Sequence, residues 1–292
     1  MHKIKVQFSG GLGNQLFTYA AFKYFADVYE YELILDYSVV ERVIGRRADL
    51  LDLKLDDEIV IRRRDISYVG DYLNRISWRN SVTRKIFRRK LYPNLTDRFD
   101  FLASVSASSN RGFFQTPEHF EKISNSNREV WFDLRSTTTR FDDLKAAVIG
   151  AEPIAIHVRR GDYRTYRNSF GLLDPLYFEN GVKLLQKKYG ERQVWLFSDE
   201  PAAVVQEFEK SGIYISRIIH PGEINSAETL KLMSLAYAQI ISNSTFSWWA
   251  GALSKSQRVV FPDPWFRSNE GWLSQTNLAL PNWNALESKW LQ

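Results

Sequence analysis

The chain contains no cysteine, which excludes a disulfide framework, a thiolate nucleophile and a cysteine-based metal site. Long hydrophobic runs are also missing, because no apolar stretch approaches the roughly 18 residues that a membrane-spanning helix needs. The first ten residues, MHKIKVQFSG, lack the pattern of a signal peptide. Together these absences predict a cytoplasmic protein. Its 292 residues, 44% hydrophobic and 25% charged, suffice for one large or two ordinary globular domains.

Several catalytic motifs are absent as well. The four histidines show no metal-ligand spacing, and there is no H-E-x-x-H, Walker lysine loop or G-x-S-x-G elbow. No aspartate lies two positions from another, so the D-x-D pair with which metal-dependent nucleotide-sugar transferases bind Mg²⁺ or Mn²⁺ is missing. A diphosphate bound by this chain would have to be met by arginines and backbone dipoles. We therefore expect neither a metal nor a cofactor.

The surplus of positive charge is confined to one segment. The whole chain carries a net charge of +5, but residues 59–92 hold ten Lys or Arg against two Asp, which leaves the remainder at −3. This distribution argues against a nucleic-acid-binding protein with a wholly positive face. Residues 73–92 could form a basic amphipathic helix, either as a solvated face of the protein or as a peripheral contact with the anionic inner face of the cytoplasmic membrane.

The N-terminal half begins with a β-α-β pattern. Residues 3–8 alternate like a strand, a glycine turn follows, apolar residues recur at helical spacing over 14–28, and residues 32–36 read as a second strand. The turn resembles a dinucleotide-binding fingerprint but has Leu16 at the third glycine position. It offers backbone N–H groups at a helix start, beside Asn14 and Gln15. The alternative is an ordinary βα turn with an Asn cap.

The chain between the two halves is harder to interpret. Residues 112–120, GFFQTPEHF, read as a strand that ends in a proline turn, with Gln115, Glu118 and His119 at its end. Residues 121–150 look like a helix-rich connection, and Glu152-Pro153 marks a boundary. We expect two domains, 1–150 and 151–292.

The C-terminal half alternates regularly between strands and helices. Strands are expected at 154–158, 193–199, 213–219, 239–244 and 258–262, and helices at 175–189, 201–211, 227–238 and 246–254. Such alternation is typical of a parallel, doubly wound α/β sheet.

Polar residues follow three of these strands, in the segments 159–162 (RRGD), 198–200 (SDE) and 243–245 (NST). The carboxyl ends of parallel strands share one edge, so these segments can converge on one ligand. Two arginines offer planar forks of donors to phosphates, an acid suits ring N–H or ribose hydroxyls, and Ser/Thr with backbone N–H suit phosphate. Jointly they predict a nucleotide-like ligand. Each of these segments, taken alone, also has a plainer interpretation. The two arginines could form salt bridges with neighbouring acids, and the other polar residues could cap helices.

Six motifs in this order resemble the bacterial and animal α-1,2-fucosyltransferase family: GGLGNQLFTYA, GFFQTPEHF, IHVRRGDY, WLFSDE, ETLKLMSLAYAQIISNSTFSWWAGAL and VVFPDPWF. The resemblance runs from about Val6 to the LPNW near Pro281, apart from residues 37–110. It implies an α/β, GT-B-like fold of two Rossmann-type halves facing a central cleft. It also implies GDP-fucose as donor, inversion at the anomeric carbon and no metal, with 1–150 on the acceptor side and 151–292 binding the GDP-sugar.

The resemblance also implies roles for individual residues. It places Arg159 on the donor diphosphate with His157 and Arg160 beside it, and Asp199 on the guanine or ribose. It implies that the phosphates are held by Ser244, Thr245 and Phe246. It also implies that the loop that faces the fucose contains Gly11, Gly13, Asn14 and Gln15. The departures are mild: Leu16 replaces the commoner Met, SDEP replaces SDD, and SWWAGAL replaces SWWGAWL.

The implied reaction moves L-fucose from GDP-fucose to the 2-hydroxyl of a galactose-containing acceptor, which could be lipid-linked, in O-antigen synthesis. A different GDP-deoxyhexose such as GDP-colitose is the alternative donor, and a non-catalytic nucleotide or glycan binder is a third interpretation. Asp162 is the nearest candidate for the general base, with Asp36 and Glu118 as rivals, and a dissociative mechanism would need no strong base. Helical spacing favours core packing over sugar stacking for the aromatic run Phe246, Trp248 and Trp249.

Overall fold

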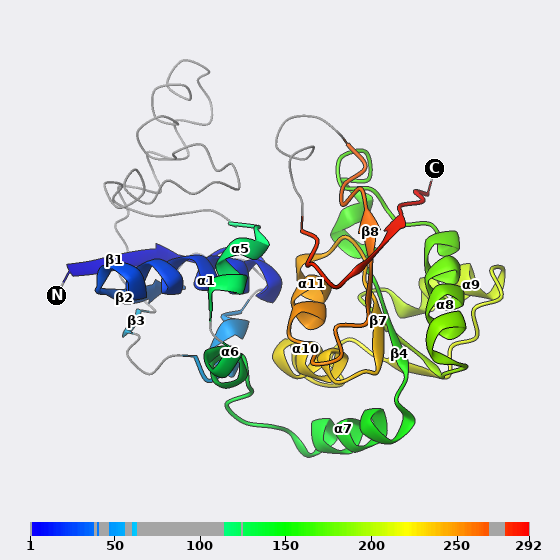
Figure 1. Ribbon diagram of the computed structural model, residues 1–292, viewed down its shortest axis with the longest axis horizontal. Helices are drawn as coiled ribbons and strands as arrows, with labels where there is room; N and C mark the ends of the chain where they lie inside the picture. Colours follow the sequence, from blue (N-terminus) through cyan, green and yellow to red (C-terminus); the bar gives the residue numbers. More distant parts are fainter. Residues whose placement is uncertain are drawn as a thin grey trace. The chain divides into compact units, whose positions relative to one another are not determined.

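The computed structural model describes residues 2–37, 40, 47–55, 60–62, 114–123, 125–268 and 278–291. Apart from β3 (Val60–Arg62), the basic segment 59–92 lies outside the described residues. The chain forms two compact units, Met1–Asn127 and Arg128–Gln292. Each unit contains its own parallel sheet (Figure 1).

The first unit confirms the N-terminal β-α-β prediction. Its sheet has the order β1-β2-β3, with β1 (His2–Gln7) and β3 parallel to the central β2 (Tyr31–Asp36). Helix α1 (Leu12–Tyr29) connects β1 to β2, and its buried residues include Leu16, Phe17, Ala20 and Ala21. A short 3-10 helix, η2 (Asp49–Asp52), lies between β2 and β3 in the chain.

The strand expected over 112–120 is wrong in its described part. Residues 114–116 have no regular structure, and helix α5 (Pro117–Lys122) follows at once. The reason is local: Thr116 accepts a hydrogen bond from the Glu118 N–H as the N-cap, and Pro117 occupies the first turn. A Thr-Pro pair of this kind starts a helix, because the proline lacks only an N–H that would be unpaired there anyway.

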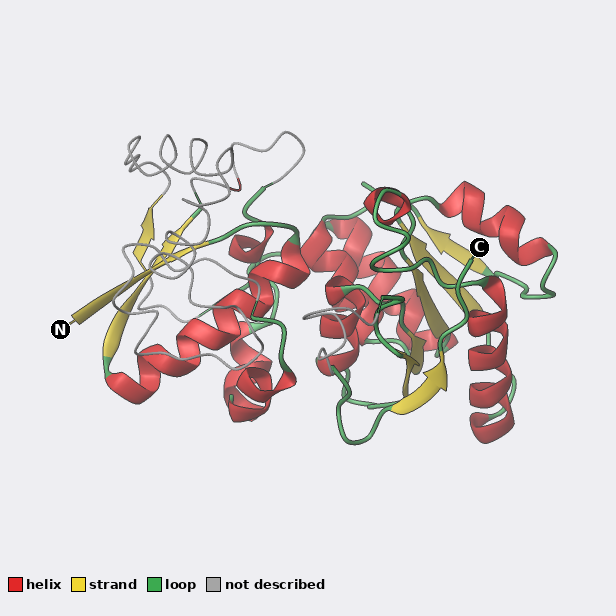
Figure 2. Ribbon diagram, turned by 90° about the horizontal axis from the view of Figure 1, so that it is seen from above, coloured by secondary structure: helices red, strands yellow, loops and turns green. Residues whose placement is uncertain are grey.

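The second unit is a doubly wound sheet with the strand order β6-β5-β4-β7-β8-β9, in which all neighbours are parallel. Its strands are β4 (Ile154–Val158), β5 (Val194–Ser198), β6 (Arg217–Ile219), β7 (Ala238–Ile240), β8 (Val259–Asp263) and β9 (Asn284–Glu287). The helices that connect them are α8 (Pro175–Tyr189), α9 (Pro201–Glu209), α10 (Ser226–Ser234) and α11 (Thr245–Ala252). Helices α8 and α9 lie on one side of the sheet and α10 and α11 on the other (Figures 1 and 2).

Strand β4 lies where the strand order reverses. The chain proceeds outward from β4 to β5 and β6, and then returns to place β7 on the other side of β4. In open α/β sheets a ligand crevice forms at the carboxyl edge of such a switch point. All five β4 residues are buried, and three of them, Ile154, Ile156 and Val158, belong with Tyr177 and Phe178 of α8 to the main core of this unit. The sequence order thus places the RRGD segment at the position where this fold binds ligands.

The boundary between the units falls earlier than the expected 150/151. Helix α6 (Asn125–Trp131) spans it, and α7 (Thr139–Ala151) belongs to the second unit. The Thr138 N–H donates to the Glu228 carboxylate of α10 at 2.7 Å, and Lys231 of α10 pairs with Asp133 at 2.9 Å. These contacts attach the predicted connection to α10 of the second unit. The helices expected over 121–150 are confirmed.

Two strand predictions differ from the structure. Strands β6 and β7 are shorter than expected, since β6 begins only at Arg217 and β7 ends at Ile240. Strand β9, parallel to β8, was not expected. In the part of the chain that the structure describes, no helix is long and apolar enough to cross a membrane.

Candidate functional site

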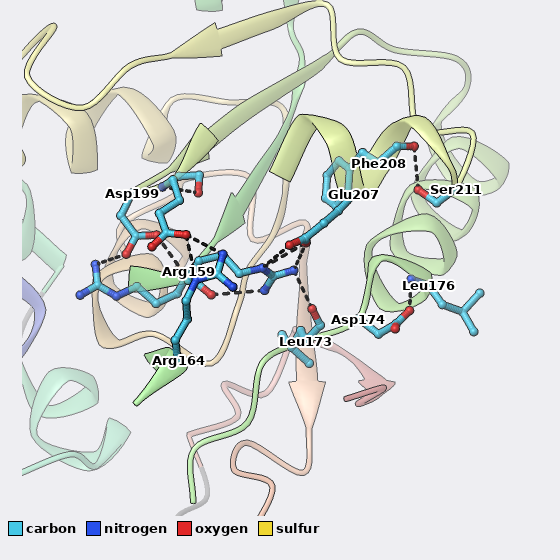
Figure 3. Close-up of polar contacts among 12 residues, drawn as sticks. Arg159, Arg164, Leu173, Asp174, Leu176, Asp199, Glu207, Phe208 and Ser211 are labelled. Atoms are coloured by element: carbon cyan, nitrogen blue, oxygen red, sulfur yellow. Dashed lines mark hydrogen bonds and ion pairs between the residues drawn. The ribbon is translucent and has the colours of Figure 1, made fainter. Parts of the chain in front are cut away.

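Arg159 stands at the carboxyl end of β4 between two carboxylates. Its Nε and Nη2 donate to Oδ1 of Asp162 at 3.0 and 2.6 Å, and its Nη1 lies 3.0 Å from Oδ2 of Asp199 (Figure 3). Asp199 follows β5, and Asp162 lies in the 3-10 helix η3 (Gly161–Arg164). Burial lowers the pKa of Arg159, but the two carboxylates raise it above its ordinary value. The side chain is 27% exposed, so this guanidinium is a cation that a ligand can still reach.

Asp199 also fixes the backbone of the turn. Its Oδ1 accepts a hydrogen bond from the Arg160 N–H at 2.9 Å. Gly161 passes so close that an added Cβ would overlap Oδ2 of Asp199. Any other residue at position 161 would therefore push this carboxylate away from its place beside Arg159. Both Asp199 oxygens already have partners, Oδ1 in the Arg160 N–H and Oδ2 in the Arg159 guanidinium. A guanine or ribose that binds Asp199, as the resemblance implies, would share these oxygens with the two arginines.

Arg160 points away from the ligand edge. Its side chain is 0% exposed, and its Nε and Nη2 donate to both carboxylate oxygens of Glu207, at distances down to 2.6 Å. The same guanidinium donates to the backbone carbonyls of Leu173 at 2.9 Å and Arg159 at 3.3 Å. The two adjacent arginines thus differ sharply: Arg159 is accessible, and Arg160 is enclosed by protein.

His157 lies beneath the site as a neutral, buried ring. Its Nδ1 is 2.8 Å from the Ser242 hydroxyl, and its ring centroid is 5.6 Å from that of Phe246. Burial, reinforced by the charge of Arg159, lowers the pKa of His157 to about 3. The ring therefore links β4 to the segment after β7 without adding charge.

The NST segment is held against the RRGD turn. The Asn243 carbonyl accepts from the Tyr163 hydroxyl at 2.8 Å, and the Asn243 side-chain amide donates to the Phe170 carbonyl at 2.8 Å. Helix α11 then starts at Thr245, with Ser244 as an N-cap whose side chain makes no cap hydrogen bond. The first turn of a helix leaves backbone N–H groups without intrahelical partners, which favours an anion there.

The aromatic run of α11 divides as helical spacing predicts. Trp248 and Trp249 are fully buried, whereas Phe246 is partly exposed next to His157. The structure therefore brings seven candidates to one edge of the second unit: Arg159, Asp162, Asp199, His157, Ser244, Thr245 and Phe246.

The remaining candidates lie in the first unit, at the start of α1. Gln15 is 0% exposed and donates to the carbonyls of Gly10 at 3.1 Å and Arg47 at 3.2 Å, which gives it a structural role in the loop. Asn14 is partly exposed, and its Oδ1 accepts from the Gln115 side chain at 3.2 Å. Gly11 is the N-cap of α1, and Gly13 is buried in its first turn. The alternative bases Asp36 and Glu118 also belong to this unit, Asp36 buried at the end of β2 and Glu118 exposed on α5.

Glu207 and Tyr163 were not predicted as site residues. Glu207 lies 47 positions from its partner Arg160, and no local motif joins them. The one available signal was physical: a second arginine at the end of a buried strand requires an acid near it. Among the described residues, no group of three or more His, Asp or Glu could hold a metal ion. Metal independence remains a prediction.

Comparisons with known proteins agree with this architecture. The structure of NodZ α-1,6-fucosyltransferase co-crystallised with GDP superposes with a TM-score of 0.52 at 16% identity, over 86% of this chain and 92% of that one. Two units, each with a parallel sheet, and this structural similarity define a GT-B-like fold.

Residues 2–287 match the model of Glycosyl transferase family 11, and the chain belongs to this family. An O-antigen biosynthesis glycosyltransferase from Escherichia coli, WbnK, is 28% identical over 94% of this chain and 97% of its own length. An α-1,2-colitosyltransferase from Escherichia coli is 24% identical over 92% of this chain and 94% of its own length.

Proposed function

We propose that the protein is an inverting glycosyltransferase that moves L-fucose from GDP-fucose to the 2-hydroxyl of a galactose-containing glycan in O-antigen synthesis. The observation that carries the proposal is the partly exposed guanidinium of Arg159 at the switch point, in the same edge as the start of α11. The relative named for O-antigen biosynthesis supports the acceptor class, and the similarly folded fucosyltransferase with GDP supports the donor class.

In this proposal Arg159 and the first turn of α11 hold the donor's diphosphate. When the acceptor hydroxyl attacks C1 of the sugar from the face opposite GDP, negative charge builds on the leaving β-phosphate. A positioned cation or N–H donor that meets this charge typically lowers the barrier by about 3–4 kcal/mol. The residues for this role come from the protein itself, and no metal is needed.

Asp162 is our candidate for the base, and in the structure it accepts hydrogen bonds from Arg159. Its Oδ1 accepts both of these N–H groups, so this oxygen can accept from a substrate hydroxyl only when the guanidinium finds another partner. A phosphate on Arg159 would supply that partner and release Asp162, which is 48% exposed. Asp36 and Glu118 remain the alternatives, and a dissociative path is open because a deoxy sugar tolerates positive charge at C1.

We propose separate tasks for the two units. The second unit, with Arg159, Asp199 and α11, binds the GDP-sugar. The first unit binds the acceptor, and residues 11–15 at the start of α1 contribute to this binding. What supports this role is the part-exposed amide pair of Asn14 and Gln115, since neutral amides suit sugar hydroxyls.

GDP-colitose is the second candidate donor, and the similarity to an α-1,2-colitosyltransferase favours it. Colitose is fucose without its 3-hydroxyl, so the two donors differ in a single polar group. A site that hydrogen-bonds a hydroxyl can reject the analogue lacking it by about 10⁴–10⁵. Donor preference should therefore be clear-cut.

The test is a mass-spectrometric screen of the purified protein with GDP-fucose, GDP-colitose and GDP-mannose against β-galactosides such as lactose, with and without EDTA. We expect a deoxyhexosylated galactoside and release of GDP at a rate that EDTA does not change. Product from GDP-colitose alone would establish the second candidate. GDP binding without any product would instead indicate a non-catalytic binder, and loss of activity with EDTA would refute metal independence.

A further inference from the structure

A buried ion pair joins Arg160 to helix α9. Arg160 is 0% exposed and Glu207 is 24% exposed at its side chain, and their closest atoms, Nη2 and Oε2, are 2.6 Å apart. Both oxygens of Glu207 accept from the same guanidinium, Oε1 at 3.3 Å and Oε2 at 3.1 Å from Nε. A buried cation is tolerated only when it is paired and its remaining N–H groups are bonded.

The remaining N–H groups of Arg160 hold the backbone of the site. Nη1 donates to the carbonyl of Arg159 at 3.3 Å, and Nη2 donates to the carbonyl of Leu173, just before α8, at 2.9 Å (Figure 3). The guanidinium thus ties together the RRGD turn, α9 and the segment that leads into α8.

The backbone of Arg160 completes a path to the neighbouring arginine. Its N–H donates to Oδ1 of Asp199 at 2.9 Å, and Oδ2 of Asp199 lies 3.0 Å from Nη1 of Arg159. The placement of the Arg159 head therefore depends on a peptide that the Arg160–Glu207 pair holds. A phosphate cannot replace Glu207 in this network, because the Arg160 side chain has no exposed surface.

We propose that Glu207 is a positioning residue: acting through Arg160, it sets Arg159 in the geometry that binds the donor's diphosphate. This inference rests on the proposed function, because it assumes that Arg159 meets the phosphates. Lysine cannot replace Arg160, since a single ammonium cannot reach a carboxylate and two carbonyls in the planar fork that arginine provides.

The test is a double-mutant cycle read by calorimetric titration with GDP. Glu207→Gln keeps an acceptor but removes the charge, and we expect it to weaken GDP binding about tenfold, as misplacement of a binding group does. Arg159→Ala should also weaken binding. The double variant should bind GDP no more weakly than Arg159→Ala, because Glu207 acts only through Arg159.

Glu209→Gln is the matched control, since Glu209 is exposed on the same helix, and its GDP affinity should equal that of the unaltered protein. Thermal unfolding of all variants separates stability from binding: a merely structural role would lower the melting temperature in both backgrounds and leave GDP affinity unchanged. Arg160→Lys, which retains the buried charge, is the second variant should Glu207→Gln fold poorly, and the same tenfold loss is expected.

Two results have separate meanings. The positioning role would be overturned if Glu207→Gln weakened GDP binding as much in the Arg159→Ala variant as in the unaltered protein. It would also be overturned if Glu207→Gln did not weaken GDP binding in the unaltered protein. Unchanged GDP affinity in Arg159→Ala would instead contradict the proposed function, since Arg159 would then not meet the phosphates.

Discussion

Arg159 differs from an ordinary surface arginine in that two carboxylates pair with it. Asp162 and Asp199 hold its guanidinium from two sides, so the side chain is oriented rather than free to sample rotamers. Pre-ordering reduces the entropy that binding would otherwise cost. Because of the same pairing, a phosphate has to compete with a carboxylate for the N–H groups of the Arg159 guanidinium.

Replacing Arg159 with alanine tests its catalytic role. We expect Arg159→Ala to lower turnover by about 10² or more, because the charge on the leaving phosphate would lose its nearest cation. Steady-state release of GDP from GDP-fucose measures the effect. Arg164→Ala is the matched control: Arg164 lies in the same turn, but its exposed guanidinium pairs with Glu200. Near-normal turnover in Arg159→Ala, with the fold intact, would refute the assignment.

Asp162→Asn separates two roles of one carboxylate. If Asp162 competes with phosphate for Arg159, its removal should tighten GDP binding about two- to fivefold, the scale of a partly exposed ion pair. If Asp162 is also the base, turnover should fall by about 10²–10⁴ in the same variant. Calorimetry and steady-state kinetics read the two effects independently. Weaker GDP binding would contradict the competition, and unchanged turnover would transfer the base role to Asp36, Glu118 or none.

At the scale of helices and strands, the sequence predicted the elements that are determined by neighbouring residues along the chain. The buried run 154–158 is β4, and the Asp174-Pro175 cap begins α8 as expected, with the Asp174 side chain accepting from the Leu176 N–H. Strand β9 escaped prediction because its sequence, NALE, does not alternate between polar and apolar residues and none of its four residues is buried. The long-range partners were also beyond reach, since Glu207 meets Arg160 only when α9 packs on the sheet.

The same distinction holds for the candidate site. That polar residues follow β4, β5 and β7 could be predicted, because parallel strands share an edge. The opposite orientations of Arg159 and Arg160 could not, since adjacent identical residues give no pattern to separate them. Nor could the engagement of both Asp199 oxygens, which depends on the backbone of the following turn.

Glu228 joins the starts of two helices, α10 and α7, by hydrogen bonds. It forms a capping box with Asn225 at the start of α10, and its other oxygen accepts the Thr138 N–H that precedes α7, while the side chain is fully buried. Glu228→Ala should lower the free energy of unfolding by about 2–4 kcal/mol, because two backbone N–H groups would lose their acceptor. Urea unfolding measures the change. Glu209→Ala, exposed at the end of α9, should shift it by less than about 0.5 kcal/mol.

At the scale of the whole molecule, buried histidines link stability to pH in both units. Burial lowers the pKa of His119 in the first unit to about 4 and that of His157 in the second to about 3. The unfolded chain takes up these protons near pH 6.5, so below that pH it binds protons that the folded state refuses. Stability should therefore be complete above pH 6.5 and fall on acidification, by about 1.4 kcal/mol per pH unit for each histidine, until the folded pKa is reached.

Unfolding by urea at pH 7, 6 and 5 checks this expectation, above the range where carboxylates dominate. His119→Gln should flatten the dependence, because it removes one of the two buried histidines. A free energy of unfolding that stays constant between pH 7 and 5 would contradict the sign that we derive.

Peripheral membrane contact through the basic segment 59–92 is our proposal for how the enzyme meets a lipid-linked acceptor. Reversing the charge of Arg88, Arg89 and Lys90 should weaken binding to vesicles containing anionic lipid, at about 1 kcal/mol per basic residue near the headgroups. Transfer to a soluble galactoside should not change. Cosedimentation with phosphatidylserine vesicles measures the first, and vesicle binding equal to that of the unaltered protein would refute the contact.

The turn after β4 also has a consequence for how the donor's affinity responds to its surroundings. Three guanidinium groups there face four carboxylates in the ion pairs of Arg159, Arg160 and Arg164 with Asp162, Asp199, Glu200 and Glu207. In the proposed site the described residues of this turn offer the donor no excess of positive charge, and the diphosphate would take the place of a carboxylate on Arg159. Added salt weakens the arginine–carboxylate pair that breaks as well as the arginine–phosphate pair that forms. GDP affinity should therefore vary little with ionic strength, unlike the affinity of an open basic surface for the same anion.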